Sequence, residues 1–594
     1  MSVYGPDSTV SAAILCEYGV WDPNLFSFTW VIRYKIFKRE GLDYLILSVP
    51  VSNKGGVKGM VFNMEGKKIT KSKLTRESIY QERVIGGYTR LRVAPPDARE
   101  GSVVDISFTM NSLPSIWRFQ KEIPVLWSEL VIPPSQYVTF NKRFQGFEGL
   151  YQSSSSRWVA KDMPPFHAEP YINSRYNYMT AILIELAEIN IPPTSNSSGY
   201  YRSYATSWDQ VADYFNDDPD YGVILRSPDL FLNEAAENIR ASSTSEEELV
   251  INALQHIRGQ VRWDETEDLY PSSKLKSIYQ NDHVGTAADM NFLFLKLLDK
   301  LDVESYPMVM SLRNEGFINP MFPSISKFNY TVSYVKIGDQ FKVIDAADKY
   351  YPYDLLNRNC LNSGGFLLKK EGGEWVEIKP GKSEENKVSC TLAMSQDGIL
   401  EGALQLQHVD YASTYFRKEQ EEYSTDDEYL EAFEKENPSL MVLDYSKQGQ
   451  DQEGAPVTET MEIEIDGNLE SAGESIILDP IVIGKMEENP FKLEKREYPV
   501  DFGHGLSESY FMSVILPEGY EITQMPEPIQ LVTTDKSGIF QYQAAQNGNM
   551  LQVMYRLSIN KPVFLQEEYL ELKTFFSLVV QKQSEPVVIT KSQP

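Results

Sequence analysis

The chain has 594 residues, of which 42% are hydrophobic and 12% aromatic, and this composition excludes a disordered chain. Its length predicts about three to five domains. With 56 Lys and Arg against 84 Asp and Glu, the formal net charge is −28, and a field of this sign repels phosphate backbones and anionic membranes. Nucleic acid is therefore not expected as a partner.

Cysteine usage and hydropathy narrow the class of protein further. The three cysteines, Cys16, Cys360 and Cys390, include no CxxC pair, which excludes a disulfide scaffold and a structural zinc site. No apolar run approaches the roughly 20 residues of a transmembrane segment. Residues 1–10 lack the basic and apolar segments of a signal peptide. We expect either a cytoplasmic protein or an exported one whose targeting segment has been removed.

Residues 1–160 are predicted to form an antiparallel β-sandwich. Apolar and β-branched runs bounded by glycine clusters recur here, as is typical of strands joined by tight turns. The runs are 26–37, 44–50, 57–63, 103–110 and 126–132. A serine cluster at 153–156 and the pair Pro164–Pro165 then indicate a connection between domains.

Residues 161–380 are predicted to form an α+β core with a helical lead-in. The apolar spacing changes towards a helical period over 178–184. Ser245 followed by Glu248 fits a capping box at the start of a further helix, and another buried helix starts near Ala287. Strands are expected at 305–312, 329–337 and 341–344, the last two joined by a hairpin turn.

Residues 381–594 are predicted to be β-rich. An acidic helix, Asp426–Glu436, and a polar stretch, Ser446–Ala455, interrupt the strand-like runs. The region is therefore expected as one unit or as two subdomains, 381–455 and 456–594. Near the end of the sequence, Glu567–Gln581 is predicted to form a helix whose wide apolar face packs on a sheet.

Short motifs occur in a characteristic order along nearly the whole sequence. They include Trp117–Gln120, Pro165–Phe166, Phe328–Asn329, Ile344–Ala346, Asn489–Phe491, Arg496–Val500 and Leu516–Tyr520. In this order they resemble a bacterial transglutaminase-like family, in which a papain-like core lies between N-terminal and C-terminal β-domains of unknown function. The resemblance implies an α+β multidomain fold with a transglutaminase-like core between an N-terminal β-sandwich and a C-terminal β-rich region.

The resemblance also assigns the active-site positions. Active members of the superfamily use a Cys-His-Asp triad, in which an imidazole oriented by a carboxylate activates a thiolate at a helix N-terminus. The corresponding positions here are Ala287, Tyr330 and Asp345. Alanine supplies no nucleophile, and tyrosine, with an unperturbed pKa of about 10, is a poor base at neutral pH. The resemblance therefore implies a degenerate triad in a core that is not an enzyme.

Two residues are candidates to replace the missing nucleophile. Thr286 is adjacent to Ala287, but a shift of one position at a helix start turns the side chain by about 100°. Cys360 fits a small buried hydrophobe better than a relocated nucleophile. His283 lies just before the helix. Its side chain is expected either to reach the cleft at the triad positions or to face solvent. A cysteine-independent hydrolase or acyltransferase acting on peptides stays open as an alternative function.

Carboxylates near the helix start raise the question of a metal site. Asp289, Asp345 and Asp348 are better explained as capping or turn groups, and no histidine is near them in sequence. Neither a metal nor a cofactor is expected. The amides at the helix N-terminus are expected to be unpaired and able to hold a partner's carbonyl or carboxylate.

The leading functional hypothesis is a non-catalytic binding or scaffold protein of the bacterial periplasm or cell envelope, with the cytoplasm as the alternative compartment. Its degenerate cleft is expected to bind a protein or peptide partner. The residues expected at the cleft are His283, Thr286, Asp289, Asn329 and Trp263. A further alternative is a carbohydrate-binding envelope protein. A glycan would then lie on Trp117, Trp127, Trp208 or Trp263, although a buried core explains each tryptophan better.

Overall fold

The computed structural model describes residues 4–45, 48–49, 56–83, 89–193, 198–466, 469–472 and 475–591. The protein divides into two compact units. The first unit contains residues 1–168, 174–347 and 362–377, and the second contains 169–173, 348–361 and 378–594. Both units combine helices with several sheets, which confirms the expected mixed, multidomain architecture.

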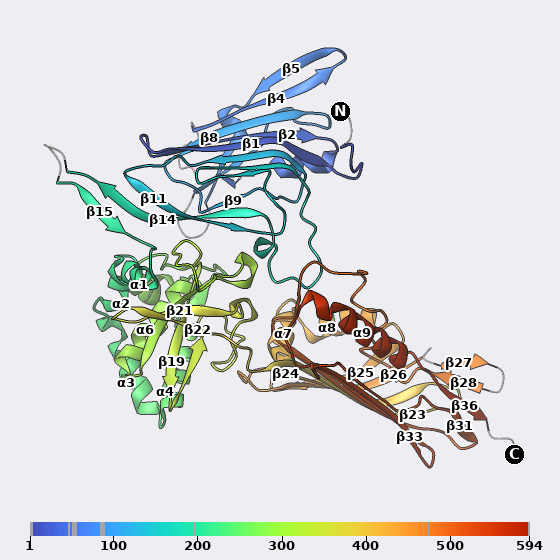
Figure 1. The fold of residues 1–594 in the computed structure, drawn as a ribbon. Helices are drawn as coiled ribbons and strands as arrows, with labels where there is room; N and C mark the ends of the chain where they lie inside the picture. The colour runs from blue at the N-terminus through green and yellow to red at the C-terminus, as the bar shows by residue number, and fades with distance from the viewer. Residues whose placement is uncertain are drawn as a thin grey trace. The chain divides into compact units, whose positions relative to one another are not determined.

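The N-terminal part of the first unit has two main layers of strands around one apolar core (Figure 1). One layer is an eight-stranded sheet in the order β12-β13-β10-β1-β2-β8-β4-β5. Its strands are β1 (Ala12–Asp22), β2 (Ser27–Ile36), β4 (Val57–Glu65), β5 (Lys68–Lys73), β8 (Val103–Met110), β10 (Val125–Val131), β12 (Gln152–Ser153) and β13 (Arg157–Met163). The other contains β9 (Ile116–Arg118), β11 (Val138–Gln145), β14 (Ala181–Ile191) and β15 (Tyr200–Ser203). Trp117 and Ile182 from this second layer are buried in the same core as Ile14 and Ile32 of the first.

Two sequence expectations for this part are wrong. β1 pairs with β10 in parallel, with Ile14 opposite Val125, so the large sheet is mixed rather than antiparallel. The segment 178–184, expected to be helical, leads into β14, which pairs with β11. Its apolar residues fit both periods, and the pairing with a strand about 40 residues earlier in the sequence decides between them.

The predicted strand at 44–50 is also corrected. Residues 39–45 form a short 3-10 helix, Arg39–Leu45. Only Ser48–Val49 forms a strand, β3, in a small sheet with β6 (Ile79–Arg83) and β7 (Thr89–Val93). Residues 46, 47 and 50 of the predicted run lie outside the described residues.

The rest of the first unit packs helices on a five-stranded sheet, in the order β20-β19-β18-β21-β22. The strands are β18 (Ser305–Met310), β19 (Tyr330–Ile337), β20 (Gln340–Ile344), β21 (Gly364–Leu368) and β22 (Gly373–Glu377). The helices are α1 (Trp208–Asp217), α2 (Gly222–Arg226), α3 (Asn233–Ser242), α4 (Glu246–Gln260), α5 (Leu275–Ser277) and α6 (Ala287–Lys300). The predicted hairpin is present, because β19 and β20 pair around Gly338, whose φ is +60°. Ahead of α6, β16 (Arg262–Trp263) pairs in parallel with β17 (Val284–Gly285).

Helix α6 is the central element of this core. Every residue from Ala287 to Leu298 is buried, including the polar side chains of Asp289, Asn291 and Lys296. It packs on β18 and β19 and on α4, and its predicted start at Ala287 is confirmed. At α4, Ser245 accepts a hydrogen bond from the Glu248 amide as predicted. The Glu248 carboxylate, however, accepts from Thr244.

The second unit is organised around an eight-stranded sheet in the order β25-β26-β24-β23-β30-β34-β33-β32. Its strands are β23 (Ser383–Met394), β24 (Leu400–Asp410), β25 (Leu440–Gln448), β26 (Val457–Ile465), β30 (Gly505–Ile515), β32 (Ile529–Val532), β33 (Gly538–Asn547) and β34 (Met550–Ile559). Strands from both sides of residue 455 therefore share one layer. Helices α7 (Tyr411–Gln420), α8 (Asp426–Glu436) and α9 (Tyr569–Gln583) lie on one face of this sheet (Figure 1).

Smaller sheets complete the second unit. β27 (Leu469–Ala472), β28 (Ser475–Leu478), β36 (Val587–Lys591) and β31 (Tyr520–Gln524) form one sheet, and β29 (Val500–Asp501) pairs with β35 (Val563–Phe564). The predicted helix near 567–581 is confirmed as α9. Its residues Tyr569, Leu572 and Phe576 are buried in the same core as Tyr510 and Phe540 of the large sheet.

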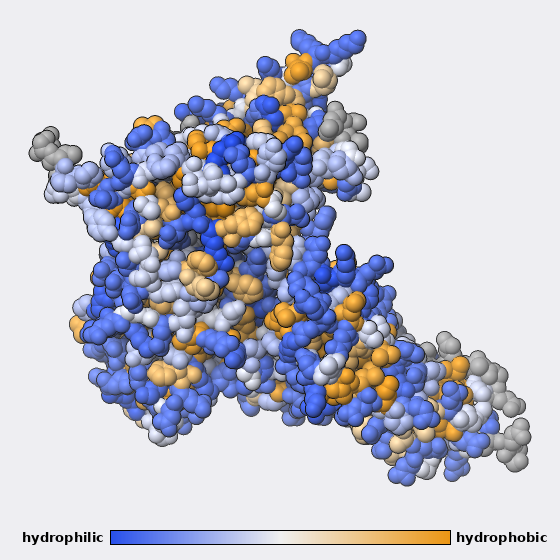
Figure 2. All heavy atoms as spheres, in the orientation of Figure 1, coloured by the Kyte–Doolittle hydropathy of each residue, from blue (hydrophilic) through white to orange (hydrophobic). Residues whose placement is uncertain are grey.

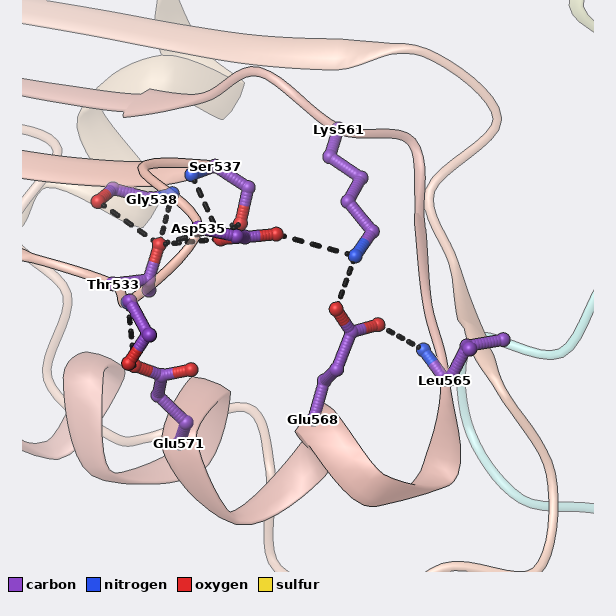
Figure 3. Close-up of polar contacts among 9 residues, drawn as sticks. Thr533, Asp535, Ser537, Gly538, Lys561, Leu565, Glu568 and Glu571 are labelled. Atoms are coloured by element: carbon purple, nitrogen blue, oxygen red, sulfur yellow. Dashed lines mark hydrogen bonds and ion pairs between the residues drawn. The ribbon is translucent and has the colours of Figure 1, made fainter.

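A polar network ties the turn between β32 and β33 to the start of α9 (Figure 3). Asp535 accepts hydrogen bonds from the amide and the hydroxyl of Ser537. Lys561 bridges Asp535 and Glu568. Glu568 also accepts from the Leu565 amide at 2.7 Å, just before the helix. The network therefore fixes the beginning of α9 beside the turn.

The surface agrees with the charged composition. The face shown in Figure 2 is mostly hydrophilic, broken by small apolar patches. Among the residues that the structure describes, no helix is long and apolar enough to cross a membrane.

Candidate functional site

The three positions assigned to a triad lie together in the first unit, at the start of α6, the start of β19 and the end of β20. The Tyr330 hydroxyl donates to Asp345 Oδ2 at 2.9 Å. Asn291, one turn after Ala287, donates from Nδ2 to Asp345 Oδ1 at 2.9 Å and to the Ala287 carbonyl at 3.0 Å. The structure thus joins all three positions through Asn291, a residue that the sequence analysis missed. Its spacing of four from Ala287 on a helix was the available signal.

This cluster of Ala287, Asn291, Tyr330 and Asp345, called here the buried cluster, is closed to solvent. Ala287 is 0% exposed, Tyr330 2% and Asp345 5%. The Ala347 amide adds a hydrogen bond to Asp345 Oδ1 at 3.1 Å. Asp345 therefore accepts from at least three neutral donors, as a buried carboxylate requires.

The buried cluster contains neither a cysteine nor a histidine. Ala287 carries no nucleophilic atom. The Tyr330 hydroxyl donates a hydrogen bond to Asp345, and a phenol is ordinarily a poor base at neutral pH. Asp345 thus accepts a hydrogen bond from a tyrosine. These contacts stabilise the junction between α6 and the sheet.

Three amides at the N-terminus of α6, those of Thr286, Ala287 and Asp289, are paired within the protein. Thr286 Oγ1 accepts from the Asp289 amide at 3.3 Å, and Asp289 Oδ2 accepts from the Thr286 amide at 2.8 Å, which closes a capping box. The Ala287 amide donates to the Thr266 carbonyl at 3.0 Å. For these three amides the expectation of unpaired groups is wrong, because the protein supplies its own cap. Burial raises the pKa of Asp289, and hydrogen bonds from Ser272 and Thr286 oppose that shift.

The other residues expected at the cleft have local structural partners. His283 is exposed in a left-handed conformation, with φ +54°, and its Nδ1 lies 3.1 Å from the Gln260 carbonyl. Trp263 donates from Nε1 to the Thr266 carbonyl at 3.0 Å. Asn329 accepts from the Leu312 amide at 2.9 Å. Trp263 lies in β16, whereas His283 and Asn329 lie in loops, and each side chain is engaged within the protein.

The alternative catalytic and metal-binding residues are placed as follows. Cys360 is 1% exposed and belongs to the second unit. Asp348, also in the second unit, forms an ion pair with Lys418 at 2.7 Å. No group of three or more His, Cys, Asp or Glu suited to a metal ion occurs within the described part of the protein.

The four tryptophans considered as a glycan platform all donate their indole N–H to other protein groups. Trp117 is buried, and the other three are half-buried. The acceptors are Ser128 for Trp117, Glu129 for Trp127, the Pro320 carbonyl for Trp208 and the Thr266 carbonyl for Trp263. They therefore belong to separate packing sites.

The first unit also contains a cavity of about 750 Å³, called here the basic cavity. It is lined by strands β11 and β14 and by the segment 317–327, and Ala287, Tyr330 and Asp345 are not among its lining residues. Phe317 and Phe322 contribute apolar surface, and Lys142, Arg143 and Lys327 contribute charge. The volume lies within the range of ligand sites, about 300–1,000 Å³.

Glu185, on β14, fixes the segment that closes the basic cavity. Its Oε1 accepts from the Ile325 and Ser326 amides at 3.0 and 3.2 Å. Its Oε2 accepts from the Ser324 and Ser326 hydroxyls at 2.7 and 2.6 Å. With four hydrogen bonds accepted, the Glu185 carboxylate holds the segment 317–327 in place.

The three cations of the basic cavity differ in their contacts with the rest of the protein. Lys142 donates to the Ser155 carbonyl at 3.2 Å, and Arg143 stacks on the Phe322 ring at 4.3 Å. Lys327 has no ion pair or hydrogen bond to another described residue. Burial, and then the nearby charges of Arg118 and Arg143, lower its pKa to about 8. The lysine ammonium is thus held in a partly desolvated site without a counter-charge in contact.

Comparison with known proteins supports the fold. The family of a domain of unknown function, DUF3858, matches residues 474–589. No curated protein sequence matches this one. Among solved structures, a candidate protease from Parabacteroides distasonis is 12% identical, with a TM-score of 0.62, and the alignment covers 98% of this chain and 99% of that one. The two proteins therefore share a fold over nearly their whole lengths.

Two other solved structures are matched over less of this protein. A candidate cysteine protease from Cytophaga hutchinsonii is 12% identical, with a TM-score of 0.18, over 59% of this chain and 85% of that one. The periplasmic domain of TgpA from Pseudomonas aeruginosa is 12% identical, with a TM-score of 0.17, and the alignment covers 49% of this chain and 89% of that one.

Proposed function

We propose that this protein is a non-catalytic binding protein of the bacterial cell envelope, and that it holds an acidic segment of a protein or peptide partner in the basic cavity. The observation that supports this most strongly is the buried cluster. Its Ala287 offers no nucleophile, and its Tyr330 and Asp345 are bound to each other at 2.9 Å away from solvent. Any function of the first unit would then depend on binding at its surface or cavities.

The chemistry of the basic cavity favours a carboxylate as the group that enters it. Three cations, Lys142, Arg143 and Lys327, line the space together with the single carboxylate of Glu185, which already binds the loop. An entering carboxylate would supply the counter-charge that Lys327 lacks, and charge-assisted hydrogen bonds of this kind are the stronger ones. The cavity therefore suits an acidic residue or the terminal carboxylate of a peptide, next to an apolar residue that would contact Phe317.

The proposal is tested with two fluorescein-labelled peptides in fluorescence anisotropy titrations of the full-length protein. One peptide places glutamate between apolar residues, and the other is identical except for glutamine. We expect the glutamate peptide to bind at least tenfold more tightly, and Lys327→Gln to remove that preference. Lys58→Gln, at an exposed position on β4, is the matched control and should leave binding unchanged. Equal binding of both peptides, or an unaltered preference in Lys327→Gln, contradicts the proposed site.

The proposed compartment rests on the family resemblance. Fractionation of cells that make the native protein, followed by immunoblotting, locates it directly. Recovery in the periplasmic or envelope fraction is the expected result, and recovery with cytoplasmic markers alone contradicts this part of the proposal.

A further inference from the structure

The second unit contains a separate cavity of about 420 Å³, called here the acidic cavity. Its floor is one face of the large sheet, where β23, β30 and β34 lie side by side. In the parallel pair β23–β30, Glu384 lies opposite Leu506 and Asn386 opposite Glu508. Because side chains at opposed positions point to the same face, both glutamates project into the same space.

The two carboxyl groups on this floor belong to Glu384 and Glu508. Neither Glu384 nor Glu508 accepts a hydrogen bond or forms an ion pair in the part of the protein that the structure describes. Burial raises the pKa of Glu508 to about 7, with a further contribution from the charge of Glu384. Burial also raises the pKa of Glu384, against the charges of Arg358 and His408. Two ionised carboxylates on adjacent strands repel each other, and a bound cation would remove that repulsion.

The other polar groups around the acidic cavity are already engaged. Arg358 donates to the Phe502 carbonyl from both Nε and Nη2, at 3.3 and 3.0 Å. His504 lies 3.0 Å from the Gly505 carbonyl through Nδ1 and 2.8 Å from the Tyr415 hydroxyl through Nε2. These groups build the wall and leave the glutamates unpaired.

Aromatic side chains enclose the space above the glutamates. Tyr415 comes from α7, Phe576 from α9, and Tyr171 and Phe502 from loops of the second unit. Aromatic faces around an acidic floor are the usual surroundings of an organic cation, which combines ion pairing with cation–π contact. We propose that the acidic cavity binds an organic cation that carries a primary ammonium or guanidinium group, with Glu384 and Glu508 as its counter-charges.

This chemistry has two sources, a small free amine and a lysine or arginine residue of a partner. The acidic cavity lies in the second unit, so the inference does not depend on the function proposed for the first. About half of the lining residues named here, including His504, Glu508 and Phe576, fall within residues 474–589, and Glu384, Tyr171 and Tyr415 do not. The binding site is therefore assembled from the matched domain together with earlier segments of the protein.

Isothermal titration calorimetry of the full-length protein tests the inference with three probes. N-acetyl-lysine methylamide carries the cation on an amino-acid backbone, butylamine carries it alone, and N-acetyl-norleucine methylamide is the neutral counterpart. We expect saturable binding of at least one cationic probe at one site per protein molecule and at least tenfold weaker binding of the norleucine derivative. Binding of the lysine derivative alone indicates a partner residue, whereas binding of butylamine as well indicates that the ammonium group suffices.

Matched variants then assign the binding to the acidic cavity. Glu508→Gln and Glu384→Gln are each expected to weaken binding of the cationic probe at least tenfold. Glu494→Gln, at an exposed position in the same unit, should bind as the wild type does. Thermal unfolding of each variant checks that it is folded, and because each substitution removes a half-buried acid without an ion pair among the described residues, no loss of stability is expected. The inference is overturned if no cationic probe binds, if the norleucine derivative binds equally well, or if both folded glutamine variants keep wild-type affinity.

Discussion

Tyr330→Phe removes one hydroxyl from the buried cluster and leaves the aromatic ring in place. In the wild type this hydroxyl donates to Asp345 at 2.9 Å, while Asn291 and the Ala347 amide supply further hydrogen bonds. The variant leaves a buried carboxylate with one donor fewer. Hydrogen bonds to charged groups contribute about 1.5–3 kcal/mol, so the free energy of unfolding of the first unit should fall by about that amount. If Tyr330 served a catalytic role instead, its loss would leave stability unchanged.

Urea-dependent hydrogen exchange with mass spectrometry measures this effect in the full-length protein, because peptides from β19 and β20 report the first unit alone. A local readout is needed, since a protein of two units does not unfold as a single two-state system. Tyr201→Phe is the matched control. This tyrosine is exposed, its hydroxyl lies 3.4 Å from Glu188, and its loss should cost under about 0.5 kcal/mol. Equal protection of β19 in wild type and Tyr330→Phe would refute the structural role assigned to this hydrogen bond.

Three further predictions follow from other contacts. Asp289→Ala removes the cap of α6 and leaves the Thr286 amide unpaired, so protection of α6 should fall by about 2–3 kcal/mol in the same exchange experiment; unchanged protection contradicts the capping role. Glu185→Gln replaces an acceptor of four hydrogen bonds, so trypsin should cleave after Lys327 several times faster than in wild type, and an equal rate shows that the loop is held otherwise. Hydrogen bonds from Ser537 hold the pKa of Asp535 well below its usual range. Because the folded pKa is depressed, this stabilisation is present above the unfolded value of about 3.9 and is lost as pH falls below it. Between pH 5 and pH 2, the free energy of unfolding should therefore fall less in Asp535→Asn than in the wild type. The expected difference is about 0.5–1 kcal/mol, because Asp535 is exposed, and it is measured by thermal unfolding. Identical pH profiles of the two proteins would refute this prediction.

Local sequence signals predicted the elements that depend on neighbouring residues. The start of α6 at Ala287, the Ser245 cap, the hairpin between β19 and β20, and the acidic helix α8 all follow from capping, turn and periodicity rules. The parallel pairing of β1 with β10 joins strands more than 100 residues apart, and no local pattern marks it. The helix expected at 178–184 failed for the same reason, since its strand partner determines its conformation.

For the candidate site too, the sequence predicted some features and not others. The resemblance correctly predicted that Tyr330 and Asp345 lie close together, since a hydrogen bond joins their side chains. The unpaired amides were a wrong inference despite a readable signal, because Thr286 and Asp289 have capping-box spacing. Neither cavity could be predicted. Glu384 and Glu508 are separated by more than 100 residues, as are Arg143 and Lys327, and only the folded sheets bring each pair to one space.

The central claim, that the core binds without catalysis, is tested most directly by a peptide assay for hydrolysis and for transfer to an added amine. Products are measured by mass spectrometry for the wild type, Thr286→Ala and Cys360→Ala. The account predicts no product above the buffer control for any of the three proteins. Product formed by the wild type and lost in either variant would contradict it and assign a displaced nucleophile to the residue replaced.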